Sequence, residues 1–227
     1  MIEIAAWIAL TLLIVLATSY IAKRFGVVYM ISMYVALILM ANIFAAKIVL
    51  VGGRLVPASV IVYSSSFLLT DMLSEFYGKK TAQTAVWAGF VANIALVFSV
   101  WVALSWDPAP VWGGQESFEA VLGNTPRVVA ASLAGYIVSQ NHDVLSYHFW
   151  KKRAPSHLWV RNNASTVVSQ GLDTVIFITI AFYGTFPVVE LIIGQYLVKM
   201  AIALADTPFL YAAKKLRLYR ETQDFPQ

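Results

Sequence analysis

The stretches D-M-L-S-E-F-Y-G-K-K (71–80) and D-V-L-S-Y-H-F-W-K-K (143–152) share one pattern, an Asp followed eight and nine residues later by Lys-Lys. A third copy of this spacing joins Asp206 to Lys214-Lys215. Each copy closes a long apolar run, and eight residues of α-helix rise about 12 Å. The pattern therefore predicts three helices in which a carboxylate lies roughly two turns inside the lysine-marked end. It also indicates duplicated helical hairpins.

The composition is typical of an integral membrane protein. Hydrophobic residues make up 59% of the 227-residue chain and charged residues 12%, about half the charged fraction of an ordinary soluble domain. The mean hydropathy is +0.72. The net charge of +4 comes from basic residues at segment ends, so we expect the lipid bilayer and no nucleic acid as a partner. The absence of cysteine excludes disulfides, thiolate metal sites and cysteine nucleophiles.

Seven apolar segments are long enough, or nearly so, for the ~20 residues that cross a bilayer. They lie near residues 4–22, 27–46, 57–77, 82–105, 127–149, 160–183 and 188–212. Lysine and arginine cluster on one side of these segments, whereas most acidic loop residues fall on the other. By the positive-inside rule, the N-terminus is expected outside and the C-terminus in the cytoplasm, in a multi-pass protein of the cytoplasmic (inner) membrane. Glu3 precedes the first apolar run, and no cleavable signal peptide is expected.

These segments predict an all-α integral membrane bundle of about seven transmembrane helices. Residues 1–26 are expected to form a peripheral N-terminal transmembrane helix. Residues 27–220 are expected to form a six-helix transport core of three helical hairpins, and residues 221–227 a polar tail. Gly52-Gly53 is interpreted as a turn, and residues 106–126 as an external loop.

Charged side chains inside the apolar segments are the main candidates for function, because a charge at a helix centre costs about 2.5–3.5 kcal/mol on insertion scales. Four aspartates lie in such positions, and Lys199 is the expected cation among them; they are Asp71, Asp143, Asp173 and Asp206. Polar residues also recur at helical spacing along 132–147 and 162–174, and Asn93 lies in 82–105. Such faces must meet inside the bundle, where they would line a hydrated or ligand-filled pocket. The alternative is that each residue only holds helices together.

Enzyme motifs are absent from the sequence. It contains no H-E-x-x-H zinc motif, no Walker A loop and no G-x-S-x-G elbow. Asp71 and Asp143 raise the alternative of an intramembrane aspartic protease, but neither follows a glycine as that site requires. We therefore expect a transporter and not an enzyme, with no catalytic residues, no metal site and no cofactor.

Two longer stretches resemble the queuosine precursor transporter family, also called the vitamin uptake transporter family. The first is V-I-V-Y-S-S-S-F-L-L-T-D-M-L-S-E-F-Y-G-K-K-T-A (60–82). The second combines S-Q-N-H-D-V (139–144) with H-L-W-V-R-N-N-A-S-T-V-V-S-Q-G-L-D-T-V-I-F (157–177). Asn42 and Lys199 also match family positions. His142 departs from the pattern, since a bulky apolar residue is usual there, and the first helix is an addition to the family's six-helix core.

The resemblance implies import of 7-deazaguanines such as preQ0 and preQ1, precursors salvaged for queuosine or archaeosine in tRNA. It also implies a core similar to the substrate-binding subunits of energy-coupling-factor transporters, working as a secondary transporter without the ATPase module. The alternatives are a capture subunit that needs a partner ATPase, and a transporter of another purine-like heterocycle or a vitamin. The sequence leaves open the coupling ion (proton or sodium), a homo-oligomer, and the choice between preQ0 and preQ1.

The hydrogen-bond donors and acceptors of a deazaguanine indicate which side chains would bind it. A carboxylate can accept from the N1–H and the 2-amino group together, and side-chain amides can bond the carbonyl and the pyrrole N–H. The predicted substrate-binding residues are Asn42, Asp71, Glu75, Asn163, Gln170 and Asp173. Asp143, Lys199 and Asp206 are predicted to form a charge network that couples transport to an ion.

Overall fold

The computed structural model describes residues 2–123, 126–184 and 187–216 and is built almost entirely of helices. Each of the seven apolar segments contains one long helix, and a short helix lies in the loop 106–126. The helices are α1 (Ile2–Phe25), α2 (Val28–Phe44), α3 (Val60–Phe76), α4 (Lys79–Ser105), α5 (Gln115–Leu122), α6 (Pro126–Arg153), α7 (Leu158–Phe182) and α8 (Val188–Lys215). The predicted polar tail, residues 221–227, lies outside the described residues.

Four segments in the described part of the chain are long and apolar enough to cross a membrane by length and composition alone. They are Ala6–Phe25 in α1, Lys79–Ser105 (α4), Ala164–Phe182 in α7 and Val188–Lys215 (α8). Helices α2 and α3 have only 17 residues each, and α3 carries Asp71 and a run of serines in its middle. The helical membrane bundle is thus confirmed, and the count of seven crossings stays a prediction.

The expectation of an all-α chain misses one small element, a β-hairpin between α2 and α3. Strand β1 (Ile48–Val51) pairs antiparallel with β2 (Arg54–Pro57), so that Val51 lies opposite Arg54. Gly52 and Gly53 have φ values of 58° and 78°, the left-handed conformation that a two-residue hairpin turn requires. The turn was expected at these glycines, but the strands were not, because four-residue strands next to apolar helices resemble helix ends.

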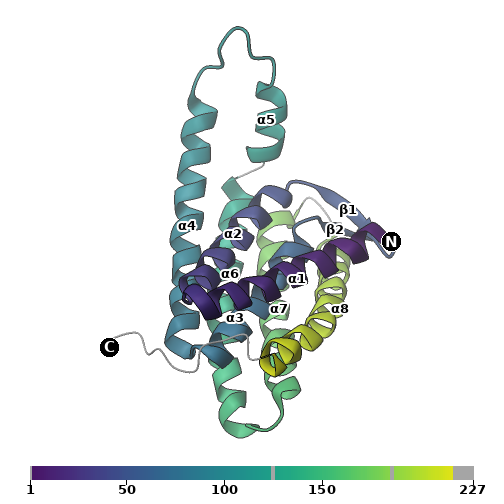
Figure 1. Ribbon diagram of the computed structural model, residues 1–227. Coiled ribbons are helices and arrows are strands. Elements are labelled where there is room, and N and C mark those ends of the chain that lie inside the picture. The colour runs from purple at the N-terminus through teal and green to yellow at the C-terminus, as the bar shows by residue number, and fades with distance from the viewer. Residues whose placement is uncertain (1, 124–125, 185–186, 217–227) are drawn as a thin grey trace.

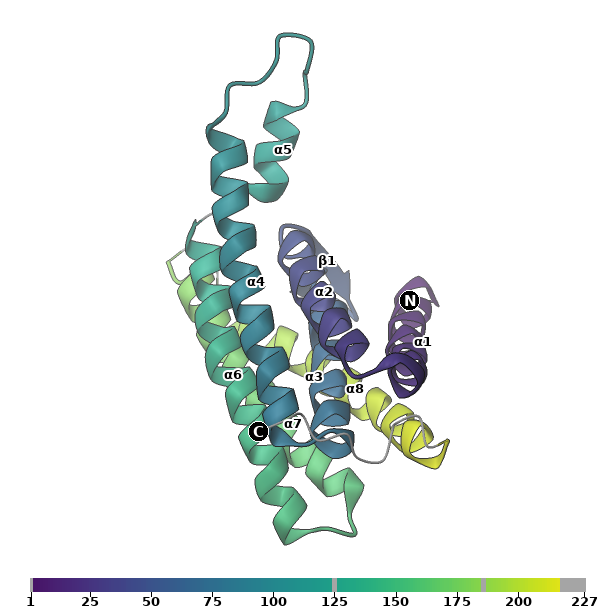
Figure 2. The same cartoon turned by 60° about the vertical axis from the view of Figure 1, so that its left-hand side comes forward.

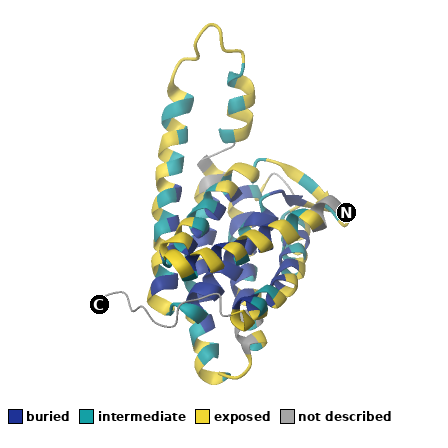
Figure 3. Cartoon of the chain, viewed as in Figure 1, coloured by how far each residue is buried: buried dark blue, intermediate teal, exposed yellow. Residues whose placement is uncertain are grey.

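Helix α3 occupies the centre of the bundle and contacts α1, α2, α4, α6, α7 and α8. Nearly every residue from Val60 to Ser74 is buried, which gives the dark core in Figure 3. Helix α1 crosses the outside of the bundle at a steep angle and packs on α2, α3 and α8 (Figure 1). Because α3 is surrounded on all sides, its serine, threonine and aspartate side chains face other helices and not lipid.

Helix α4 extends beyond the other helices, and α5 lies beside its upper part (Figures 1 and 2). Its 27 residues correspond to about 40 Å of helix, whereas the hydrocarbon core of a bilayer is about 30 Å thick. Large apolar side chains are exposed along it, including Trp87, Val91 and Phe98. The face they form is suited to lipid, and the extra length forms a projection beyond the bundle.

Helix α6 packs tightly against α4 at Gly89. The Tyr136 hydroxyl donates a hydrogen bond to the Val86 carbonyl at 2.7 Å, which holds the tyrosine over this glycine. A Cβ at position 89 would overlap that hydroxyl and lie 3.1 Å from a ring carbon of Tyr34. The contact therefore requires a residue without a side chain.

We predict that Gly89→Ala lowers the free energy of unfolding by about 1–3 kcal/mol, the usual cost of overpacking a filled core. Thermal unfolding of the detergent-solubilised protein measures this effect. Gly113→Ala is the matched control, because nothing lies within 4 Å of a Cβ built there. Equal unfolding temperatures for the two variants would contradict the close contact.

Candidate functional site

A polar pocket lies between six helices, in the half of the bundle near the β-hairpin. The empty space between its walls is about 470 Å³, which includes open space at its mouth. Its wall combines polar and aromatic side chains with a few aliphatic ones. The lining residues are Ile38, Ala41, Asn42, Ala45, Ser59, Val60, Tyr63, Asn93, Ser132, Tyr136, Asp173, Phe177, Gln195 and Lys199.

A buried ion pair between Asp173 of α7 and Lys199 of α8 lies in the pocket wall. The Lys199 ammonium bonds to Oδ2 of Asp173, and the two residues are 1% and 5% exposed. The Tyr63 hydroxyl of α3 donates to Oδ1 of Asp173 at 2.8 Å. The same tyrosine ring lies 5.2 Å from the Lys199 ammonium, within the range of a cation–π contact. Three helices are thus joined by one neutralised charge pair.

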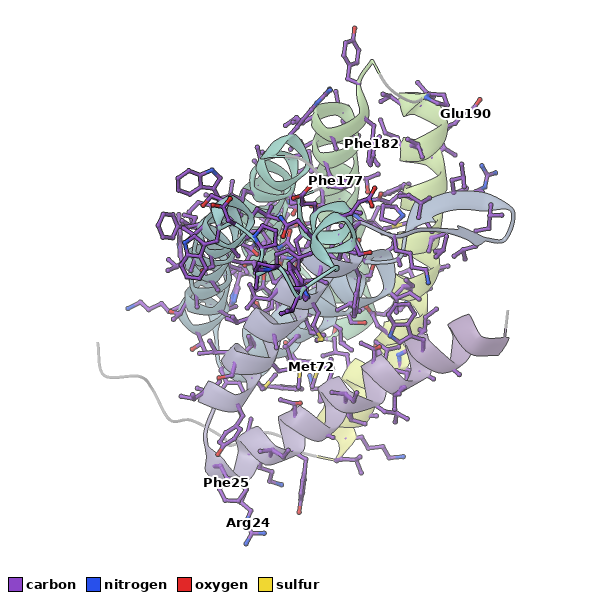
Figure 4. The ribbon with its side chains drawn as sticks, turned by 90° about the horizontal axis from the view of Figure 1, so that it is seen from above. Arg24, Phe25, Met72, Phe177, Phe182 and Glu190 are labelled. Carbon is purple, nitrogen blue, oxygen red and sulfur yellow. The ribbon has the colours of Figure 1, made fainter. Side chains whose placement is uncertain are left out.

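Side-chain amides and aromatic rings supply the rest of the pocket wall. Asn42 Nδ2 donates to Asn93 Oδ1 at 2.6 Å, which links α2 to α4. Gln195 Oε1 is buried and has no hydrogen-bond partner among the described residues, so it is an available acceptor. Tyr136 and Phe177 provide ring surface, and Figure 4 shows Phe177 among the side chains at the middle of the bundle, with Arg24 and Glu190 at its rim. Such walls suit a flat, polar heterocycle.

The pocket lies at the hairpin end of its helices. Ala45 follows α2 and Ser59 precedes α3, and these two residues flank the hairpin. Asp173 and Phe177 likewise belong to the last turns of α7. The lysine-marked ends of the helices lie at the other end of the bundle, so the pocket is displaced from the middle toward the hairpin.

A second polar cluster lies deeper in the bundle, around Asp71 of α3 and Asp143 of α6, which are 1% and 0% exposed. Thr166 donates to Oδ2 of Asp71 at 3.3 Å, and Thr70 donates to Oδ2 of Asp143 at 3.2 Å. The two carboxyl groups are close enough for their charges to interact, and Asp206 is close enough to interact with Asp71. Three of the four membrane aspartates therefore gather at one place.

A third group of charges joins the end of α3 to the lysine-marked ends of α6 and α8. The prediction that Lys79 and Lys80 end the helix of Asp71 is wrong, because α3 ends at Phe76 and these lysines begin α4 after Gly78. Glu75 lies 2.9 Å from the Lys214 ammonium and 3.4 Å from that of Lys151. Tyr147 also donates to Glu75 at 3.2 Å, and Lys151 reaches the backbone carbonyls of Ser74 and Glu75. These contacts join α3, α6 and α8 at the end opposite the pocket.

The structure separates the residues that were expected to bind substrate together. Asn42 and Asp173 line the pocket, and Lys199, expected in the charge network, lies there as well. Asp71 belongs to the buried cluster with Asp143, and Glu75 belongs to the charged group at the end of the bundle opposite the pocket. Gln170 is fully buried and does not line the pocket, and the side chain of Asn163 lies outside the described residues.

Tyr63 and Gln195 line the pocket but were not anticipated. Both had a signal in the sequence. Tyr63 is seven residues before Thr70 and so shares its helix face, and Gln195 is one turn before Lys199. Asn93, Ser132 and Tyr136 belong to the polar positions recognised along their segments, although no binding role was assigned to them.

Comparisons with known proteins agree with these membrane features. The model of the family described as "Putative vitamin uptake transporter" matches residues 57–213, the part from the end of β2 through most of α8. A protein of Bacillus subtilis (strain 168) named "Probable queuosine precursor transporter" is 38% identical over 181 residues, which are 78% of this chain and 79% of that protein. No solved structure matches the chain.

Proposed function

The chain belongs to the vitamin uptake transporter family, whose members are membrane transporters and not enzymes, and from this premise we propose that it imports queuosine precursors. The substrates would be 7-deazaguanines such as preQ0 and preQ1, bound in the pocket beside Asp173. The observation that carries this proposal is a buried carboxylate facing amide side chains in a pocket with aromatic walls.

Asp173 is proposed to accept hydrogen bonds from the guanine-like edge of the substrate. That edge presents the N1–H and the 2-amino group side by side, and a carboxylate can accept both. Lys199 bonds Oδ2, whereas Tyr63 and Ser139 bond Oδ1. A carboxylate offers about four acceptor positions, so a substrate that displaces the long 3.4 Å contact from Ser139 can bind without breaking the ion pair. The balanced charge keeps the empty pocket stable inside the membrane.

Three side-chain amides are proposed to hydrogen-bond the substrate, those of Asn42, Asn93 and Gln195. An amide N–H can donate to the substrate carbonyl, and the free oxygen of Gln195 can accept from the pyrrole N–H. Tyr136 and Phe177 would lie against the ring. This assignment keeps Asn42 and Asp173 from the sequence prediction and replaces Asp71, Glu75 and Gln170 with residues of the pocket wall.

The transport cycle would alternate between two states around this pocket. By the distribution of lysines, the end held together by the Glu75 contacts would be the cytoplasmic one, and we assign the structure to an outward-facing state on this basis. Import requires the Glu75 contacts to open while the hairpin end closes. Nothing in this cycle needs an ATPase, which supports a secondary transporter built on the six helices α2–α4 and α6–α8.

Uptake in cells tests the substrate class. The host should neither make nor import queuosine precursors, and queuosine in tRNA is measured after preQ0 or preQ1 is added to the medium. The intact chain should give modified tRNA, and so should Asp107→Asn, a control in the exposed loop. Asp173→Asn at equal membrane expression should not. Absence of modification with the intact chain in the membrane would refute the proposed substrates.

Transport by the purified protein tests the energy source. Proteoliposomes that contain this chain alone should accumulate labelled preQ1. Binding without transport under these conditions would refute the secondary mechanism and favour a capture subunit that depends on a partner ATPase.

A further inference from the structure

We propose that Asp71 and Asp143 form a proton-binding pair that drives transport, separate from the substrate pocket around Asp173. This inference rests on the proposed function, because it assigns the coupling ion and its site. Asp71 was expected to bind substrate, and the structure instead places it against Asp143, below the pocket.

The pair has an excess of negative charge and of acceptor atoms. The hydrogen bonds that the two carboxyl groups accept come from hydroxyl groups, including those of Thr70 and Thr166, and not from a cation. Oδ1 of Asp71 and Oδ1 of Asp143 are buried and have no hydrogen-bond partner within the described residues. Lys199, the buried lysine of α8, is bonded to Asp173. Two adjacent carboxylates away from water cannot both remain charged at low cost, and one shared proton removes the repulsion.

A separate observation points to a proton at this place. The Tyr34 hydroxyl of α2 is fully buried, has no hydrogen-bond partner among the described residues, and lies within electrostatic range of Asp143. A tyrosine hydroxyl can both donate and accept, so it suits a site whose carboxyl group alternates between acceptor and donor.

The groups around the pair set its proton affinity. Asp206 of α8 adds a third carboxyl group near Asp71, and Tyr34 of α2 lies within electrostatic range of Asp143. On α6, His142 directs Nδ1 toward Ser169 of α7 at 2.9 Å. Helix α1 has charged residues at 23–24 and α4 at 79–80, in both cases at a helix end. Glu75 lies one turn beyond Asp71 on α3 and is bound to lysines. Among the described residues, no lysine or arginine donates a hydrogen bond to Asp71 or Asp143.

The pair and the pocket share the same four helices, which provides the coupling. Helix α3 carries Tyr63 and Asp71, α6 carries Tyr136 and Asp143, and α8 carries Lys199 and Asp206. Helix α7 carries Asp173 and Thr166 in the same way. Buried polar residues lie between the two levels, including Ser66, which accepts from Gln140 at 3.3 Å, and Gln170. Any shift of these helices therefore changes both sites together.

The proposed step moves one proton with one substrate molecule. The proton from the outer solution forms an O–H bond with one carboxylate of the pair while substrate enters the pocket. Loss of the repulsion lets the helices repack, and the same O–H bond breaks when the pair faces the cytoplasm. The pair returns to its starting charge, so no other reactant is needed.

Proteoliposome transport separates coupling from binding. With the wild-type chain, an inside-alkaline pH gradient should concentrate labelled preQ1 above the outside level, and a sodium gradient should not. Asp143→Asn should lose this concentration but retain exchange of labelled for unlabelled preQ1 across the membrane. Asp107→Asn is expected to behave as wild type. Proton-driven concentration by Asp143→Asn, or concentration by a sodium gradient alone, would overturn the proposal.

An infrared measurement tests the site without any substrate. The wild-type protein and Asp107→Asn should show a protonated-carboxyl C=O band that disappears as the pH rises, and the Asp71→Asn/Asp143→Asn double variant should lose it. An unchanged band in the double variant would overturn the assignment. If no variant exchanges preQ1, the proposed substrate fails, and the infrared result still decides whether the pair holds a proton.

Discussion

Asp173→Asn is expected to abolish substrate binding and to lower the free energy of unfolding by about 3–5 kcal/mol, the largest effect in the chain. The substitution leaves the Lys199 ammonium buried without its counter-charge, and an uncompensated buried charge carries a cost of this size. It also removes the acceptor proposed for the N1–H and 2-amino group. Thermal unfolding and isothermal titration with preQ1 measure the two effects separately.

The double variant Asp173→Asn/Lys199→Met separates fold from recognition. With both charges gone, the unfolding temperature should return close to that of the wild type, because replacing a buried ion pair by uncharged groups is often neutral. Binding of preQ1 should stay lost. Tyr63→Phe is a graded control that removes one hydrogen bond to a charged group, worth about 1.5–3 kcal/mol, and keeps the ring beside Lys199. Recovery of binding in the double variant would show that Asp173 does not read the substrate.

Glu75→Gln is expected to open the lysine-marked end of the bundle. The substitution weakens the contacts with Lys151 and Lys214 that join α3, α6 and α8. Because these lysine side chains are 33% and 44% exposed, we expect a shift of only about 1–2 kcal/mol, or roughly tenfold in the balance between closed and open states.

A cysteine label at position 74 reports this opening. The chain contains no cysteine, so Ser74→Cys introduces a single reactive group, and Ser74 is fully buried beside Glu75. Ser74→Cys alone should react slowly with a membrane-impermeant maleimide applied to the lysine-marked side, and addition of Glu75→Gln should raise the rate roughly tenfold. Glu119→Gln, on the exposed helix α5, is the matched control. Identical rates with and without Glu75→Gln would refute the closing role.

The seven long helices and their buried polar faces could be predicted from the sequence because each rests on local spacing. A twenty-residue apolar run or an i, i+4 polar face is visible in one segment alone. Lys199 was expected to join a charge network with Asp143 and Asp206, and the structure pairs it with Asp173 instead. Which aspartate it meets depends on how α7 and α8 pack, and that is not a local property.

The sequence could not predict how deep within the bundle each polar residue lies. Asp71 and Glu75 were grouped with the pocket residues because all are polar and lie inside apolar segments. Asp71 is eight residues beyond Tyr63, however, which moves it about 12 Å along α3, and Glu75 is one further turn away. The family resemblance identified the motif that contains Asp71 and Glu75, but it did not predict how deep in the bundle these residues lie. The hairpin was missed for another reason, since its short strands carry no periodicity long enough to detect.

The projection formed by α4 and α5 makes this part of the chain a natural place for insertion. No lining residue of the pocket comes from residues 101–122, and neither the carboxyl pair nor the Glu75 contacts involve this segment. Loop tips far from packed residues tolerate added sequence best. A rigid domain fused between Asp107 and Gly114 would therefore leave transport intact and give this small protein the mass outside the detergent micelle that imaging by electron microscopy requires.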